Sequence, residues 1–158
     1  MKRWICFIFP VLFALTGCSF LGKSRDVPDS DYYFYHIDET KTELVKVAYE
    51  PNRETTENMI QDFMQLLNSK VHGKNDISLL PEDVEIVTHS VHDGVLNLDF
   101  NRAYLQMDAA REVLARAGVV KTFAQIPDIQ YVKFQVDSKP FLDSNQKPIG
   151  IMNEESFL

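Results

Sequence analysis

The chain has 158 residues, of which 45% are hydrophobic, and a formal net charge of −7 at neutral pH. This apolar content, which includes eleven phenylalanines, is sufficient for the core of one domain of ordinary size. Nucleic-acid phosphates and anionic lipid headgroups repel an acidic chain, so the charge excludes a nucleic-acid-binding protein and a membrane binder that relies on basic residues.

The N-terminal residues have the pattern of a secretory signal. Two basic residues precede the apolar run Trp4–Leu15, and small residues then lead to Cys18. The motif Leu-Thr-Gly-Cys resembles the bacterial lipobox, in which the cysteine is acylated and becomes the first mature residue. The sequence therefore predicts a signal peptide over 1–17, cleavage between Gly17 and Cys18, and lipidation of Cys18.

An uncleaved membrane span is the alternative, and it needs roughly 20 apolar residues. The run before Cys18 is shorter and contains Pro10, so the lipid anchor is favoured. Cleavage would remove Cys6, Lys2 and Arg3, which leaves no thiol in the domain and takes the formal charge to −9. Two or three acyl chains hold a protein firmly at a bilayer. We expect the acylated chain on the extracytoplasmic face of a cell membrane, in either a Gram-positive or an outer-membrane setting.

Residues 18–30 are predicted to form the lipidated cysteine and a polar tether, which reaches roughly 40 Å when fully extended. The remaining residues, 31–158, are predicted to form one domain. Its first half indicates a β-hairpin, from the aromatic run Tyr32–Ile37 and the alternating run Glu43–Tyr49. A helix is predicted from about Thr55 to Asn68 and a loop over 71–81. The apolar stripe of this helix comprises Ile60, Phe63, Met64 and Leu67.

The second half begins with the clearest local signal, two alternating runs, 84–91 and 95–100, around an Asp-Gly turn. A second helix is predicted from Asp108 to Gln125, a strand over 132–136 and a small closing hairpin over 141–151. The predicted inner stripe of the second helix comprises Ala110, Val113, Leu114, Ala117 and Val120 or Lys121. The order β-β-α-β-β-α-β indicates an α+β fold, with two helices packed on one face of a mixed, mainly antiparallel sheet.

Patterns for catalysis or metal binding are weak. His89 and His92 stand three apart on a strand, so they point to opposite faces, and His36 and His72 have no carboxylate or thiol at ligand spacing. All four are expected to be solvent-facing histidines of strands or turns. A calcium loop with Asp143, Asn145 and Glu154 is broken by Lys147 and Pro148. The acidic cluster Glu82, Asp83 and Glu85 is expected on a solvated surface rather than in a glycosidase site. We predict a protein that is not an enzyme and needs no metal or other cofactor.

The aromatic run at the start of the domain is a candidate interaction surface. Alternation places Tyr33 and Tyr35 on one face and Tyr32 and Phe34 on the other. If one face packs in the core, the other presents a row of rings able to stack on sugar or to dock a protein. The alternative is that the helices or the tail cover both faces.

Four stretches of the domain, 91–100, 119–123, 129–137 and 139–152, carry a resemblance to a known family. Through them the domain resembles the GerMN family of sporulation and spore-germination proteins over 32–158. Ser138 stands where glycine is frequent in the family. The resemblance implies a fold similar to ring-building motifs and a role in protein assembly at the cell envelope, with no catalytic signature.

The sequence supports two alternative functions. The first is a membrane-anchored, non-enzymatic module that binds envelope or sporulation proteins through a sheet edge or an exposed sheet face. The second is a cell-wall glycan-binding or hydrolytic protein that uses Tyr32–Tyr35 and nearby acidic residues. Homo-oligomerisation is compatible with either function.

Overall fold

The computed structural model describes residues 28–51, 55–70 and 76–157. The predicted signal peptide, the lipidation site Cys18 and His72 lie outside the described residues. No helix within the described ranges is long and apolar enough to cross a membrane. The elements, in chain order, are β1 (Tyr32–Asp38), β2 (Leu44–Tyr49), α1 (Thr56–Ser69), β3 (Asp76–Ile77), β4 (Ile86–His92), β5 (Val95–Phe100), the 3-10 helix η1 (Arg102–Gln106), α2 (Ala109–Phe123), β6 (Tyr131–Val136), β7 (Lys139–Pro140) and the 3-10 helix η2 (Glu154–Phe157).

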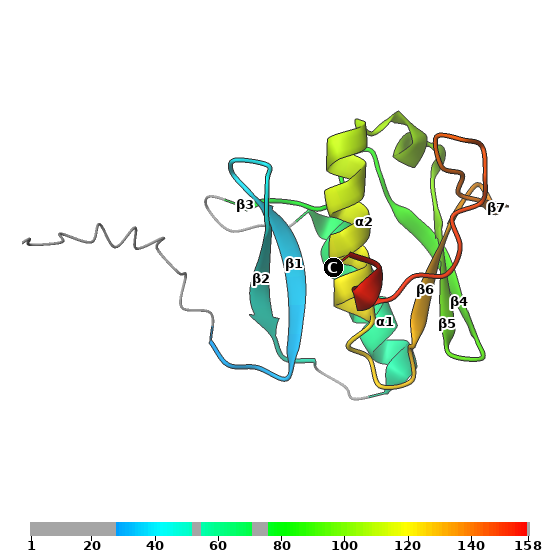
Figure 1. The fold of residues 1–158 in the computed structure, drawn as a ribbon. Helices are drawn as coiled ribbons and strands as arrows, with labels where there is room; N and C mark the ends of the chain where they lie inside the picture. Colours follow the sequence, from blue (N-terminus) through cyan, green and yellow to red (C-terminus); the bar gives the residue numbers. More distant parts are fainter. Residues whose placement is uncertain (1–27, 52–54, 71–75, 158) are drawn as a thin grey trace, which may run out of the picture.

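The predicted α+β class, with two helices and mixed, mainly antiparallel strand pairing, is confirmed. The strands, however, form two sheets rather than one: a three-stranded sheet in the order β2-β1-β3 and a four-stranded sheet in the order β4-β5-β6-β7. Figure 1 shows the helices between the two sheets, with β1 and β2 on one side and β4, β5 and β6 on the other. The expectation of a single sheet with both helices on one face was therefore wrong. The predicted loop over 71–81 also contains β3, which pairs with the end of β1.

Side-chain caps begin both helices where the sequence predicted. The Thr55 side chain accepts a hydrogen bond from the Asn58 N–H at 3.4 Å, and the Asp108 carboxylate accepts one from the Arg111 N–H at 3.0 Å. Lys70 ends α1 in the left-handed conformation at φ 56°.

The buried surface of α2 differs from the predicted stripe. Val113, expected inside, is exposed, whereas the C-terminal half of the helix is buried almost all round. A helix on one sheet needs only one apolar stripe, but a helix between two sheets must be apolar on opposite sides. Gly118 lies at the contact of α2 with Leu44 and Leu79, where a Cβ atom would clash with Leu79 and make a tight contact with Leu44. The buried α2 residues are Ala115, Ala117, Gly118, Val119, Val120, Thr122 and Phe123.

Two hairpin turns orient the strands of the four-stranded sheet. Asp93 and Gly94 join β4 to β5 with φ 48° and φ 75°, the left-handed pair that a type I′ turn needs. Asp137 and Ser138 repeat this conformation between β6 and β7, at φ 49° and φ 60°. The Asp99 carboxylate accepts hydrogen bonds from the Ser138 N–H at 2.9 Å and hydroxyl at 2.8 Å. These bonds stabilise the left-handed backbone conformation of Ser138.

Candidate functional site: the free edge of β4

The two sheets end in four edge strands, which differ in how they are protected from pairing with another chain. Natural edges are blunted by charge, proline or shortness. β2 carries Lys46 near its middle, β7 has two residues including Pro140, and β3 also has two residues. β4 has seven residues without any lysine, arginine, aspartate, glutamate or proline, and five of them are exposed. Among the described strands, β4 is the edge with least protection.

The turn determines which backbone groups of β4 face away from the sheet. In a two-residue hairpin the residues that flank the turn, here His92 and Val95, form a hydrogen-bonded pair. Alternation then directs the N–H and C=O groups of Val91 and His89 away from β5. No hydrogen bond found in the described part of the chain occupies these groups. They form a free row to which an extended peptide can add.

A side chain forms hydrogen bonds with the backbone groups of Ile86, the first residue of β4. The Asn68 amide at the end of α1 accepts from the Ile86 N–H and donates to the Ile86 C=O, both at 2.9 Å. A β-bulge follows between Ile86 and Thr88. The accessible edge therefore extends from Thr88 to His92.

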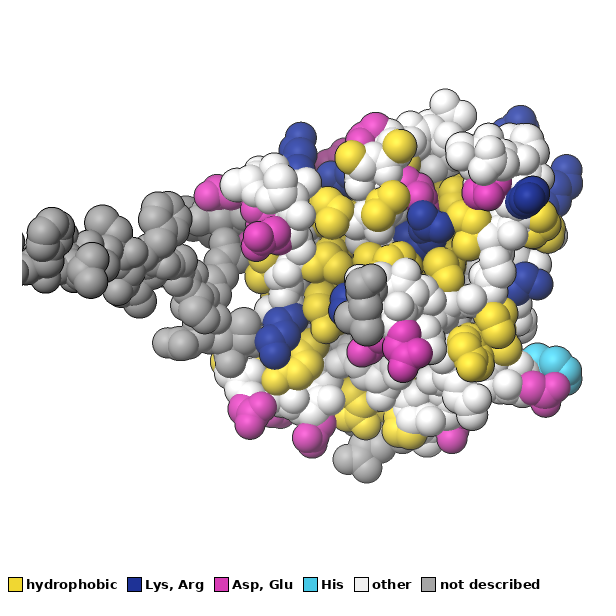
Figure 2. Space-filling view, viewed as in Figure 1, with side chains coloured by type: hydrophobic (Ala, Val, Ile, Leu, Met, Phe, Trp, Pro, Cys, Tyr) yellow, Lys and Arg dark blue, Asp and Glu magenta, His cyan; other side chains and the backbone are white. Residues whose placement is uncertain are grey.

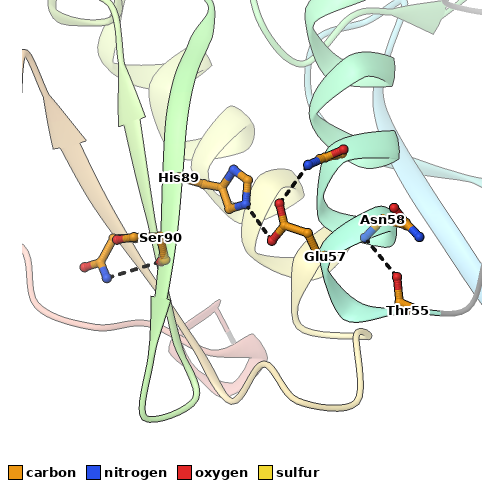
Figure 3. Close-up of polar contacts among 7 residues, drawn as sticks. Thr55, Glu57, Asn58, His89 and Ser90 are labelled. Carbon is orange, nitrogen blue, oxygen red and sulfur yellow. Dashed lines mark hydrogen bonds and ion pairs between the residues drawn. The ribbon is translucent and has the colours of Figure 1, made fainter.

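Exposed apolar and polar groups lie on either face beside this edge. Val87 is 63% exposed and Val91 is 41% exposed, so a bound strand would cover apolar surface. Figure 3 shows His89 pointing from β4 towards Glu57 on α1, with Ser90 directed away from the helix. The His89 Nε2 atom lies 3.2 Å from Glu57 Oε2, and Gln61 Nε2 donates to Glu57 Oε1 at 2.8 Å.

The hydrogen bond from His89, and then that from Gln61, lowers the pKa of Glu57 from its ordinary value. Glu57 is therefore a carboxylate at neutral pH, and it provides a fixed negative charge next to the strand. The contact also orients the His89 ring towards α1. Only the backbone of this residue is then presented at the free edge.

A family model described as sporulation and spore germination (Germane) matches residues 31–141, which is more than half of the chain. The chain belongs to this GerMN family. No protein with a curated description matches the sequence.

Solved structures show the same fold for the GerMN domain. The tandem GerMN domains of the sporulation protein GerM from Bacillus subtilis superpose with a TM-score of 0.61 at 16% identity, over 79% of this chain and 46% of that chain. This chain thus spans about half of the tandem protein. The first GerMN domain of GerM alone gives 0.60 at 16% identity, over 79% of this chain and 97% of the domain. A Clostridium perfringens protein described as a candidate lipoprotein gives 0.51 at 23% identity, over 75% of this chain and 85% of that chain.

Tyr33 and Tyr35 of the GerMN domain are both partly buried rather than fully exposed. The Lys46 Nζ atom lies 4.4 Å from the centre of the Tyr33 ring, and burial raises the pKa of Tyr35. The Gln125 side chain accepts from the Tyr33 N–H at 2.6 Å and donates to its C=O, which closes the neighbouring edge of β1. The predicted alternation is present, but helices and tail cover much of both faces.

The histidines are placed differently from one another. His92 is exposed at the β4–β5 turn as expected, with Nε2 3.1 Å from Asp93, whereas His89 is mostly covered by its contact with Glu57. His36 is only 3% exposed and packs edge-on against Phe34, so the expectation of a solvent-facing residue was wrong. Its strand is covered on both faces. The described residues contain no group of three His, Cys, Asp or Glu side chains able to hold a metal ion.

The C-terminal hairpin contains two sequence patterns that also occur in functional sites, a calcium-loop pattern and a Ser-x-x-Lys pattern. Asp143 accepts from the N–H groups of Asn145 and Lys147 at 2.8 and 2.9 Å, which makes it a turn residue. Ser144 and Lys147 have Ser-x-x-Lys spacing, which was not predicted as a site, and both are exposed in this same turn. The small hairpin predicted here is confirmed by the bridge between Leu142 and Pro148.

Surface hollows also lie away from β4. One of about 420 Å³ lies beside the start of β1 and contains Tyr32 and Tyr49, with acidic residues around them. Another of about 500 Å³ lies between η1, α2 and the C-terminal hairpin. At the latter, Tyr104 donates to Glu112 at 3.0 Å, and Arg116 Nε forms an ion pair with the same oxygen at 3.1 Å without a hydrogen bond to any described residue. Figure 2 shows hydrophobic, acidic and basic side chains interspersed on the face that carries α2 and η2.

Proposed function

We propose that this GerMN domain is a membrane-anchored, non-enzymatic module of the cell envelope that binds another protein by strand addition at β4. The observation that carries the proposal is the free edge from Thr88 to His92, with its outward backbone groups and no protecting charge. Backbone hydrogen bonds supply affinity in this mode of recognition, and alternate side chains supply specificity. Membership of a sporulation and spore-germination family supports a role in envelope assembly.

The lipid anchor would set where this binding takes place. Acylated Cys18, after cleavage behind Gly17, would hold the domain within roughly 40 Å of the extracytoplasmic membrane face. In Figure 1 the described chain begins beside β1 and β2, and β4 lies on the far side of the helices. The free edge would therefore remain accessible to a partner while the tether holds the opposite side.

Cell fractionation tests the anchor. Cys18→Ala should move the protein from the membrane to the soluble fraction, because no acyl chain can be attached, and the melting temperature of the domain should be unchanged. Cys6→Ala is the matched control, since Cys6 precedes the cleavage position. Unchanged membrane retention of Cys18→Ala would refute the lipid anchor.

Photo-crosslinking in intact cells tests strand addition. A photoreactive residue at Val87 should give a specific protein adduct, identified by mass spectrometry, whereas one at Lys46 on β2 should not. Val91→Pro should abolish the adduct, because proline removes an outward N–H without removing a bond to β5. Equal adducts from β2 and β4, or an adduct insensitive to Val91→Pro, would contradict the proposal.

Glycan binding is the second candidate, and the hollow of about 420 Å³ beside Tyr32 and Tyr49 favours it. Asp29, Asp31 and Glu50 also line this hollow, and aromatic rings with carboxylates are common partners of sugar hydroxyls. Soluble peptidoglycan fragments should then shift NMR signals of these residues. Unchanged spectra at millimolar fragment would exclude this candidate.

A further inference from the structure

We propose that β4 selects a basic, extended segment of its partner, an inference that rests on the proposed strand addition. The strand itself is uncharged, so the charges around it determine which sequence can lie alongside. Acidic side chains are present at both ends of the edge and beside it. The partner strand that complements this frame carries lysine or arginine near its two ends.

The charges at the N-terminal end of β4 are mostly negative. Glu82, Asp83 and Glu85 are exposed there. Two cations lie near them: Lys70, and Arg111, which lines a hollow with Asp83 and Val84 and donates to the Ser78 C=O. The Lys70 ammonium donates to the Val84 C=O, and burial lowers the pKa of Lys70. Lys70 and Arg111 are thus both engaged with backbone carbonyls, and the three exposed carboxylates outnumber them.

The rest of the edge adds two more carboxylates. Asp93 is 86% exposed at the hairpin tip, and Glu57 on α1 is 59% exposed beside His89. On the outer face of the sheet, Asp99 is engaged by Ser138, and Lys133 lies on β6, two strands from the edge. Strands are about 4.8 Å apart, so Lys133 is about 10 Å from β4 and is largely screened in physiological salt.

A second copy of the chain fits this edge poorly. Antiparallel pairing of two β4 strands about Ser90 would place the Glu85 end of each strand beside the Asp93 turn of the other. Like charges would then meet at both ends of the pair, and like-charged residues opposite one another destabilise strand pairing. A basic strand makes the same backbone bonds and replaces both repulsions with attraction.

The exposed valines determine the middle of the partner segment. Val87 and Val91 leave apolar surface beside the edge, and β-branched residues pack well on such a pleated surface. The complementary segment therefore has valine or threonine in its centre and lysine or arginine at its ends.

Peptide titration tests this inference on the mature full-length chain in detergent micelles, followed by backbone NMR. The probe is an amidated peptide of alternating valine and threonine with two lysines at each end, and its matched control has glutamate in place of lysine. The lysine peptide should bind at least about tenfold more tightly and shift β4 signals, and its affinity should fall when salt rises from about 0.05 M to about 0.5 M. Asp93→Asn should weaken binding about two- to fivefold, with Glu39→Gln in the exposed β1–β2 turn as a control that removes a carboxylate away from β4.

The outcomes separate this inference from the proposed function. If both peptides bind equally and Val91→Pro abolishes both, strand addition stands and the preference for a basic partner is overturned. If the lysine peptide binds equally to the Val91→Pro chain, simple charge attraction replaces strand addition. Binding of neither peptide at millimolar concentration overturns both. A dimer in sedimentation that Val91→Pro dissociates would assign the edge to a second copy and overturn the inference.

Discussion

The contact between α2 and the segment before β4 makes Gly118→Ala a sensitive test of how the helix layer is packed. In an open helix this substitution stabilises by about 1 kcal/mol, because glycine has the lower helix propensity. Here the added Cβ would lie 2.5 Å from Leu79 Cδ2, 2.7 Å from Leu79 Cδ1 and 3.2 Å from Leu44 Cδ2. Leu79 is fully buried, so it has little room to move.

The clash should outweigh the propensity gain. Overpacking a filled core costs about 1–3 kcal/mol, so Gly118→Ala should lower the free energy of unfolding by about 1 kcal/mol. Leu79→Val removes both clashing Cδ atoms and by itself costs about 1 kcal/mol through lost burial. In that background Gly118→Ala should become stabilising by up to about 1 kcal/mol, which gives a coupling energy of about 2 kcal/mol.

Urea unfolding followed by far-UV circular dichroism measures all four members of this cycle. The slope of free energy against urea should stay constant, since the variants change packing and not the size of the fold. Stabilisation by Gly118→Ala in the wild-type background would refute the reasoning. An equal effect of the substitution with Leu79 and with Val at that position would also refute it.

Three further predictions concern single polar groups. Asn68→Ala removes both hydrogen bonds to the Ile86 backbone, so it should lower the free energy of unfolding by about 1–2 kcal/mol. Exchange of the Ile86 amide hydrogen should also become faster. Unchanged stability and exchange would show that these two bonds do not protect the start of β4. Burial raises the pKa of Tyr104 well above 10, so the folded state keeps a proton that the unfolded state loses, and stability should fall as pH rises above 10. Urea unfolding between pH 8 and 11 should show a smaller fall for Tyr104→Phe, and an identical fall would argue against this assignment. The hydrogen bond from the Thr40 side chain, with those from the backbone N–H groups of residues 40, 42 and 43, lowers the pKa of Asp38 to about 2. The stability that the Asp38 carboxylate gives to the β1–β2 turn should therefore be lost only as pH falls from 3.8 towards 2. Carbon-detected NMR titration gives the midpoint, and a value near 4 would show that these bonds do not form in solution.

Local chemistry accounts for the elements that were predicted correctly. The Asp-Gly pair at 93–94 specifies a two-residue turn, Asp108 is a preferred helix cap, and the alternation from Val95 to Phe100 places Leu96 and Leu98 in the core. Each of these signals acts over a few residues, so it can be interpreted without knowing what packs against it. The family resemblance rests on the same local patterns.

Only the tertiary structure decided how the elements are layered. Periodicity shows that a strand has an apolar face but not which sheet it joins, so the division into two sheets could not be predicted. For the same reason Val113 was expected inside and His36 outside, since the burial of each depends on a second layer across the helices. The free edge had a sequence signal in the uncharged run Ile86–His92. That run becomes a binding surface only because β4 lies at the end of its sheet, which long-range strand pairing determines.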